Sequence, residues 1–250
     1  MMSLQDKVVF ITGGARGIGA EVARRLRNKG ARLVLTDLDK AELAALAAEL
    51  GEDRVLTAVA DVRDLPAVQA AAAKAVERFG GIDVVVANAG INSYGSVLQV
   101  DPEAFKRVMD VNVLGVFHSV RATLPALTER RGYVLIVSSL AAYAAAPGWA
   151  AYNASKAGVE MIANTLRLEV GDRGVAVGSA HMSWIDTALV RDTRADVPSF
   201  GELPIRETTA ELLPRIDAEA AALGRSTSAY NESLTPNVDS LRKNGGISPN

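Results

Sequence analysis

Short apolar runs rich in β-branched residues alternate with longer amphipathic stretches over the first 180 residues of the chain. Continuous apolar runs of this length are typical of strands buried on both faces of a parallel sheet. The runs predict six strands, at Val8–Thr12, Arg32–Thr36, Val55–Ala60, Val84–Asn88, Val134–Ser138 and Val175–Gly178. Helical periodicity predicts helices between them at about 18–29, 40–50, 65–79, 103–128 and 152–170. This alternation predicts a doubly wound, three-layer α/β/α fold built on a parallel sheet.

The pattern changes after about residue 190. Residues 191–207 contain two prolines and scattered charges, which favours a loop or lid, and residues 208–223 are predicted to be helical. Residues 224–250 are polar and follow neither period, as is typical of a surface tail or a disordered segment. We therefore expect one domain over residues 1–190, a lid or helical segment of the same domain over 191–223, and a tail.

Composition excludes several classes of function. The chain has 250 residues, a net charge of -2 and no cysteine, so disulfides and thiolate metal sites are ruled out and we predict no metal site. A near-neutral chain lacks the basic excess typical of nucleic-acid binding. Residues 132–155 carry no charge and are long enough to span a bilayer, but their serines, proline and glycine favour a strand, a loop and a helix start. We predict a cytoplasmic protein with no membrane or nucleic-acid partner.

A glycine-rich turn directly follows the first predicted strand and opens the first helix. Residues 12–19 read Thr-Gly-Gly-Ala-Arg-Gly-Ile-Gly, with candidate site residues Gly13, Arg16, Gly17, Ile18 and Gly19. Glycine permits the unusual backbone angles of such a turn and a close backbone approach to a pyrophosphate, which the amides at the helix N-terminus then bind. The turn predicts a dinucleotide-binding Rossmann domain over residues 1–190.

Asp37 indicates which dinucleotide is bound. It ends the second predicted strand, 18 residues after Gly19, where a carboxylate can accept hydrogen bonds from the adenosine ribose. The same carboxylate would repel a 2′-phosphate, which favours NAD over NADP. Arg16 points the other way, because a guanidinium in the turn can face a 2′-phosphate. We give Asp37 the greater weight and predict NAD.

Tyr152 and Lys156 are four residues apart on a predicted helix and so share one face. A free phenol has a pKa of about 10 and is a poor acid or base at neutral pH. A nearby ammonium favours the phenolate and lowers that pKa. The pair therefore predicts proton transfer to or from an alcohol oxygen by Tyr152, with Lys156 setting its acidity.

These motifs together, with Asn88-Ala89-Gly90, Asn112 and Ser139 in the same order and spacing, make residues 6–190 resemble the short-chain dehydrogenases/reductases. The resemblance implies that Tyr152 is the general acid/base, that Lys156 also holds the nicotinamide ribose, and that Ser139 binds the substrate oxygen. It further implies that Asn112 holds a water of the proton relay. Implied cofactor contacts are Asp61, Val62, Asn88, Ala89, Gly90, Ile185 and Thr187, and the substrate would lie near Ser139, Tyr94 and Trp184.

The sequence departs from the family pattern in two places. Met182 and Ser183 replace the usual Pro-Gly pair after the sixth strand, and the usual seventh strand near the C-terminus is absent. His181 is tempting as a catalytic group, but a strand-end role is favoured because Tyr152 already supplies the acid. The long helices at 103–128 and 152–170, which form the family's other interface, persist and predict a homodimer, with a homotetramer as the alternative.

The resulting hypothesis is an oxidoreductase that transfers a hydride between NAD and a secondary alcohol or its ketone. One alternative is an NADP-dependent carbonyl reductase of the 3-oxoacyl type, with Arg16 reading the phosphate. A second is a dinucleotide-binding sensor without turnover, which would have no use for the combination of Asn112, Ser139, Tyr152 and Lys156.

Overall fold

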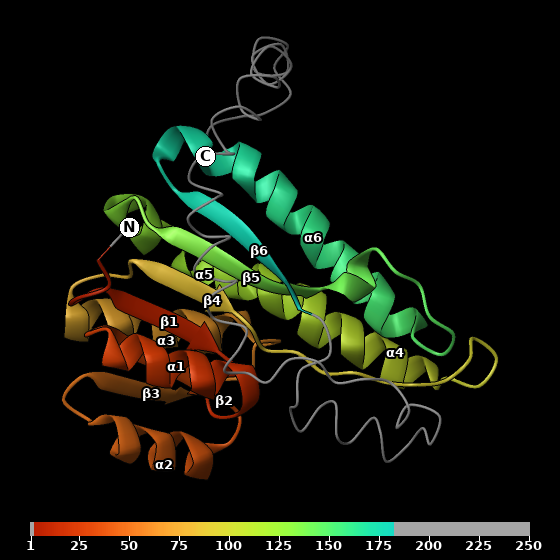
Figure 1. Ribbon diagram of the computed structural model, residues 1–250, viewed down its shortest axis with the longest axis horizontal. Coiled ribbons are helices and arrows are strands. Elements are labelled where there is room, and N and C mark those ends of the chain that lie inside the picture. The colour runs from red at the N-terminus through yellow and green to blue at the C-terminus, as the bar shows by residue number, and fades with distance from the viewer. Residues whose placement is uncertain (1–2, 183–250) are drawn as a thin grey trace.

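The computed structural model describes residues 3–182 of the chain and contains one parallel sheet covered by helices on both faces (Figure 1). All strand pairs are parallel, in the order β3-β2-β1-β4-β5-β6. The strands are β1 (Val8–Thr12), β2 (Arg32–Asp37), β3 (Val55–Val59), β4 (Val84–Ala87), β5 (Tyr133–Ser139) and β6 (Ala176–Met182). The helices are α1 (Gly17–Asn28), α2 (Lys40–Leu50), α3 (Leu65–Phe79), α4 (Pro102–Met109), α5 (Gly115–Arg130) and α6 (Ala150–Val170). The predicted doubly wound sheet of six strands is confirmed.

Two apolar clusters fill the spaces between the sheet and the helices. Residues of α1 and α2 pack on one face of the sheet, and residues of α3, α5 and α6 pack on the other. The strands β1 and β4 lie at the centre, and every residue of both is buried. The strand order reverses between β1 and β4, and in open sheets of this kind ligands bind beyond the carboxyl ends of the strands at that point.

Local capping signals set where several helices begin. The carboxylates of Asp39, Asp64 and Asp101 accept hydrogen bonds from first-turn amides of α2, α3 and α4, which stabilises helix ends that lack partners within the helix. A proline follows within the first two positions of both α3 and α4. Gly80 ends α3 in a left-handed conformation with a φ of 79°. These short-range contacts explain why most boundaries could be predicted to within a few residues.

The structure departs from the prediction in two elements. The helix expected at 103–128 is divided into α4, a π-helical stretch at Asp110–Leu114, and α5. Strand β6 runs to Met182 rather than to Gly178, because Ser179 and His181, which the apolar pattern excluded, have polar partners on α6. The uncharged segment 132–155 folds as β5, a loop and the start of α6, and none of the helices in residues 3–182 has the length and apolar character to cross a membrane.

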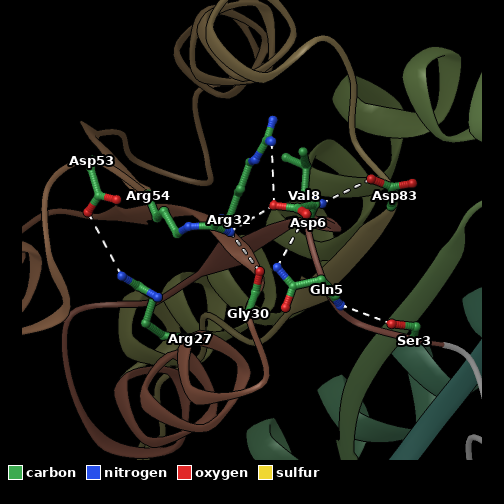
Figure 2. A network of polar contacts seen from close by, with 10 residues as sticks. All are labelled: Ser3, Gln5, Asp6, Val8, Arg27, Gly30, Arg32, Asp53, Arg54 and Asp83. Atoms are coloured by element: carbon green, nitrogen blue, oxygen red, sulfur yellow. Dashed lines mark hydrogen bonds and ion pairs between the residues drawn. The ribbon is translucent and has the colours of Figure 1, made fainter.

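Charged residues gather at the amino ends of the strands, whereas the glycine-rich turn follows the carboxyl end of β1. Figure 2 shows the contacts among them. The Asp6 carboxylate lies 2.9 Å from Arg54 and 3.5 Å from Arg32, which links the segment before β1 to β2 and to the start of β3. The buried Asp83 accepts hydrogen bonds from the Val8 amide at 2.9 Å and from the Lys7 ammonium at 2.8 Å. These contacts align β1 with β4 at the end remote from the candidate site.

Candidate active site

The glycine-rich turn has the backbone conformation that the sequence required. Gly13 and Gly17 have φ angles of 63° and 54°, in the left-handed region that disfavours side chains. A Cβ added to Gly19 would lie 2.1 Å from the Gly13 carbonyl oxygen, so α1 can pack against the turn only with glycine there. No side chain caps α1 at its N-cap residue Arg16, and its first amides therefore remain available to an anion. The turn fits the pyrophosphate of a dinucleotide.

Asn88, after β4, holds this turn against the centre of the sheet. Its Nδ2 atom donates hydrogen bonds to the Thr12 and Gly13 carbonyls, both at 3.0 Å. The buried Thr12 hydroxyl accepts from the backbone amides of Asn88 at 3.1 Å and Ala89 at 3.3 Å. Asn88 and Ala89 therefore position the turn, and Thr12 is a member of the site that sequence reasoning placed in the motif without giving it a role.

Asp37, at the end of β2, lies directly beside the turn. Its carboxylate accepts hydrogen bonds from the Ala15 amide at 3.1 Å and from the Leu38 amide at 2.8 Å. The Arg16 guanidinium lies 3.6 Å from the carboxylate of Asp39. Negative charge thus borders the turn on the side of β2, and Arg16 already has an acidic neighbour.

Asn112 lies in the π-helical stretch and ties three segments together. Its Oδ1 atom accepts from the Ile91 amide at 2.8 Å, and its Nδ2 atom donates to the Ile91 carbonyl at 2.9 Å and to the Ser155 hydroxyl at 3.0 Å. The Ser155 hydroxyl donates in turn to the Tyr152 carbonyl. Single π-helical turns within helices are frequent at functional sites, and this one holds the loop after β4 against α6.

Ser139, Tyr152 and Lys156 come together beyond the carboxyl end of β5. The Ser139 hydroxyl donates to the Met182 carbonyl at 3.3 Å and accepts from the Ala141 amide at 3.1 Å. The buried Lys156 ammonium donates to the Val137 carbonyl at 2.8 Å and lies 5.5 Å from the centre of the Tyr152 ring. The structure therefore brings a hydroxyl, a phenol and an ammonium to one edge of the sheet.

The pKa values of the two titrating groups are shifted by burial. Burial raises the pKa of the Tyr152 phenol to about 12, and a hydrogen bond with Ser139 opposes this. Burial also lowers the pKa of the Lys156 ammonium to about 8. An ammonium 5.5 Å from the ring favours the phenolate, so Lys156 acts against the effect of burial on Tyr152. The environment by itself does not give Tyr152 the lowered pKa that its expected role requires.

Comparison with known proteins identifies the family. A family model described as short chain dehydrogenase matches residues 7–198. The chain belongs to the short-chain dehydrogenase family. It is 34% identical to trans-4-hydroxycyclohexanecarboxylate dehydrogenase of Sinomonas cyclohexanicum over 208 residues, covering 80% of this chain and 79% of the relative.

Two other relatives have the same degree of identity to this short-chain dehydrogenase. It is 34% identical to an uncharacterised NAD-dependent oxidoreductase of Mycobacterium tuberculosis, covering 81% of this chain and 79% of that protein. It is also 34% identical to acetoacetyl-CoA reductase of Synechocystis, covering 82% of this chain and 83% of that protein. The crystal structure of gox2181 matches with a TM-score of 0.73 and 29% identity, covering 78% of this chain and 79% of that one.

The residues expected to contact the adenosine are more strongly paired within the chain than the sequence suggested. The Asp61 carboxylate accepts hydrogen bonds from the Arg63 guanidinium through both oxygens, with a shortest contact of 2.6 Å, and the hydrogen bond to Arg63 lowers the pKa of this carboxyl. Val62 is buried, and its carbonyl oxygen lies 2.9 Å from Nδ1 of His118. Adenine contacts by Asp61 and Val62 in this short-chain dehydrogenase remain a prediction.

An aromatic contact beside Tyr152 was not anticipated from the sequence. The buried ring of Trp149 lies edge-to-face against Tyr152, with centroids 5.5 Å apart. The half-exposed Tyr94 contacts Trp149 in the same manner, at 6.3 Å. Trp149 precedes Tyr152 by three residues, and that helical spacing was the signal available in the sequence.

Three expected site residues have no structural account. Trp184, Ile185 and Thr187 lie outside residues 3–182, and their expected contacts with substrate and nicotinamide remain predictions. The lid and tail segments at 191–223 and 224–250, and the position of a seventh strand, also lie outside the described residues. The predicted turn, the residues after β4, Asn112, Ser139, Tyr152 and Lys156 all lie along the carboxyl edge of the described sheet.

Proposed function

We propose that the chain is an NAD-dependent oxidoreductase that transfers a hydride between the dinucleotide and a secondary alcohol or its ketone. The observation that carries this proposal is the placement of Ser139, the Tyr152 phenol and the Lys156 ammonium, which lies 5.5 Å from the Tyr152 ring, at the end of the sheet that carries the glycine-rich turn. The bound dinucleotide would accept or supply the hydride. The similarity to an NAD-dependent oxidoreductase of Mycobacterium tuberculosis supports the same activity.

The side chains of the site bind the substrate, transfer the proton and position the proton donor. The Ser139 hydroxyl holds the substrate oxygen, and the Tyr152 phenol gives that oxygen a proton during ketone reduction or takes one during alcohol oxidation. The Lys156 ammonium stabilises the phenolate form of Tyr152. Asn112 fixes the π-helical stretch and, through Ser155, the first turn of α6, which carries Tyr152.

NAD is proposed over NADP because of the charges around the turn. Asp37 already binds the Ala15 amide and therefore lies where the adenosine ribose would approach. The competing influence of Arg16 is reduced, because its guanidinium has the Asp39 carboxylate as a neighbour. We expect NAD to bind at least tenfold more tightly than NADP in a fluorescence titration. Tighter binding of NADP would overturn this choice of cofactor.

The substrate is proposed to be apolar near the reacting carbon. Trp149 and Tyr94 place aromatic rings beside Tyr152, and Leu140 is exposed directly after Ser139. A relative that is a trans-4-hydroxycyclohexanecarboxylate dehydrogenase supports a ring-borne alcohol, whereas a relative that is an acetoacetyl-CoA reductase supports a 3-oxoacyl substrate. An absorbance screen for NAD-linked turnover over cyclic alcohols, steroids and acetoacetyl-CoA separates these two candidates.

Replacing Tyr152 by phenylalanine tests the mechanism. We expect Tyr152→Phe to lose at least 99% of turnover while its Kd for NAD stays within about twofold, because only the proton-transferring hydroxyl is removed. Tyr133→Phe is the matched control, since Tyr133 begins β5 at the opposite end of the strand. Unchanged turnover in Tyr152→Phe would show that another group is the acid, and dinucleotide binding without any turnover in the wild type would favour a sensor.

We also propose a homodimer formed through α5 and α6. These helices and the π-helical stretch before α5 carry exposed apolar side chains: Phe117 on α5 is 44% exposed, Met161 on α6 64% and Leu114 in the π-helical stretch 41%. Exposed apolar side chains on a protein surface are typical of interaction sites. Analytical ultracentrifugation tests the proposal, and a monomer at micromolar concentration would contradict it.

A further inference from the structure

A buried carboxylate on α6 has no part in the mechanism proposed above. Glu160 is 8% exposed, and its Oε1 atom accepts a hydrogen bond from the Ser179 hydroxyl at 2.9 Å. Its Oε2 atom lies 2.8 Å from Nε2 of His181. Because the carboxylate only accepts, Nε2 carries the proton. A buried carboxylate is costly unless it is paired and hydrogen-bonded, and both of these partners come from β6, which runs beneath α6 (Figure 1).

Tyr143 extends the cluster to the loop between β5 and α6. Its hydroxyl lies 3.3 Å from Nε2 of His181, and the two rings meet edge-to-face with centroids 5.2 Å apart. Although most of the Tyr143 side chain is exposed, desolvation of its phenol and the nearby Glu160 carboxylate raise the pKa of that phenol. The phenol therefore stays protonated and keeps a hydrogen to donate. Glu160 thus joins α6 to the end of β6 and to this loop.

Both of these segments hold Ser139. Residue His181 directly precedes Met182, whose carbonyl accepts the Ser139 hydroxyl, and Met182 is paired with Ser139 in the β5–β6 register. Tyr143 follows by two residues Ala141, whose amide donates to Ser139 Oγ. The donor and the acceptor that orient the Ser139 hydroxyl are therefore each within two residues of a partner of Glu160.

We propose that Glu160 is a positioning residue for Ser139: by tying His181 and Tyr143 to α6, it fixes the Met182 carbonyl and the Ala141 amide that orient the Ser139 hydroxyl. The inference rests on the proposed function for its catalytic meaning. Its structural part, the fixing of the segment from Ser139 to Trp149 by a carboxylate on α6, can be measured without any turnover.

Hydrogen exchange measures the structural part directly. We expect Glu160→Leu to raise amide exchange in peptides covering residues 139–149 and 179–182 at least tenfold, because Ser179 and His181 lose their partner on α6 and Tyr143 loses its link to that helix through His181. Glu169→Leu is the matched control, an exposed glutamate near the end of the same helix, and should leave these peptides unchanged. Tyr143→Phe removes only one hydroxyl of a largely exposed side chain and should raise exchange in 139–149 alone. Unchanged exchange in that loop in both Glu160→Leu and Tyr143→Phe would overturn the proposal.

Kinetics test whether the contacts of Glu160 with His181 and the loop affect catalysis through Ser139. We expect Glu160→Leu to lower kcat at least tenfold with the Kd for NAD within twofold, because a displaced hydroxyl affects the reaction and not the dinucleotide turn. Glu160→Gln keeps one acceptor and should recover part of the rate. In the Ser139→Ala background, Glu160→Leu should cause no further loss. A full further loss in that background would show a purely structural role and overturn the proposal.

The two proposals fail in different ways. If the wild type turns over no alcohol or ketone but the exchange pattern is as expected, the proposed function is wrong, and the positioning of residues 139–149 by Glu160 is supported. If turnover depends on Tyr152 but substitution of Glu160 changes neither amide exchange nor kcat, the positioning role of Glu160 is wrong and the proposed function stands.

Discussion

Replacing Lys156 by methionine should make the protein more stable at neutral pH while removing its activity. The Lys156 ammonium is buried, and its one described acceptor is the Val137 carbonyl. Burial lowers the pKa of Lys156 from 10.5 to about 8. Each pKa unit corresponds to about 1.4 kcal/mol, so holding the charge in the folded protein costs about 3 kcal/mol at pH 7. Loss of the hydrogen bond to Val137 offsets about 1 kcal/mol, which leaves a net gain of about 2 kcal/mol for Lys156→Met.

The stability difference between Lys156→Met and the wild type should depend on pH. Below pH 8 the lysine is charged in both the folded and the unfolded protein, and the full cost applies. Between pH 8 and 10.5 the folded protein releases the proton while the unfolded chain keeps it, so the wild type gains stability as the pH rises. The difference in unfolding free energy between Lys156→Met and wild type should therefore shrink by about 2 kcal/mol from pH 7 to pH 9.5.

Urea unfolding followed by circular dichroism at pH 7 and pH 9.5 measures both quantities. Lys74→Met is the matched control, because Lys74 is exposed on α3 and should give a difference near zero at both pH values. The reasoning is refuted if Lys156→Met is less stable than the wild type at pH 7, or if its advantage is the same at both pH values.

Three further predictions test the turn, the sheet and the interface. Gly19→Ala, whose Cβ would lie 2.1 Å from the Gly13 carbonyl, should weaken NAD binding at least tenfold by calorimetry, and unchanged affinity would show that the turn can relax. Asp83→Ala leaves the Val8 amide without its 2.9 Å acceptor and should lower the unfolding free energy by about 2 kcal/mol in urea, whereas a loss below 0.5 kcal/mol would contradict the role given to this carboxylate. Met161→Glu buries a charge in the proposed interface and should shift the sedimentation coefficient from dimer to monomer at micromolar concentration. A dimer that persists would place the interface elsewhere.

Most of the fold could be predicted from the sequence because its signals are short-range. The β-branched runs of β1 and β4, the glycines of residues 12–19 and the aspartates that cap α2 and α3 act within a few residues of themselves. The motif residues could be predicted for the same reason, since Tyr152 and Lys156 share a face on any helix. The positions of Ser139 and Asn112 at the same end of the sheet were expected from the family resemblance, since no local spacing links them to Tyr152.

Two features could be learned only from the tertiary structure, because they depend on contacts between residues distant in sequence. The π-helical stretch follows from Asn112, whose amide binds Ile91 and Ser155, 21 and 43 residues away. The extra length of β6 follows from the contacts of the buried Ser179 and the partly buried His181 with Glu160, where polar residues would otherwise end a buried strand.

The surroundings of Tyr152 were decided in the same way. Its helical spacing to Lys156 is local, but the burial that raises its pKa and lowers that of Lys156 comes from segments packed around both side chains. The sequence alone allowed Tyr152 and Lys156 to be proposed as the groups that carry the chemistry. The energetic cost of holding a charge or a phenol there depends on desolvation by residues distant in sequence, and for that reason only the folded chain could reveal it.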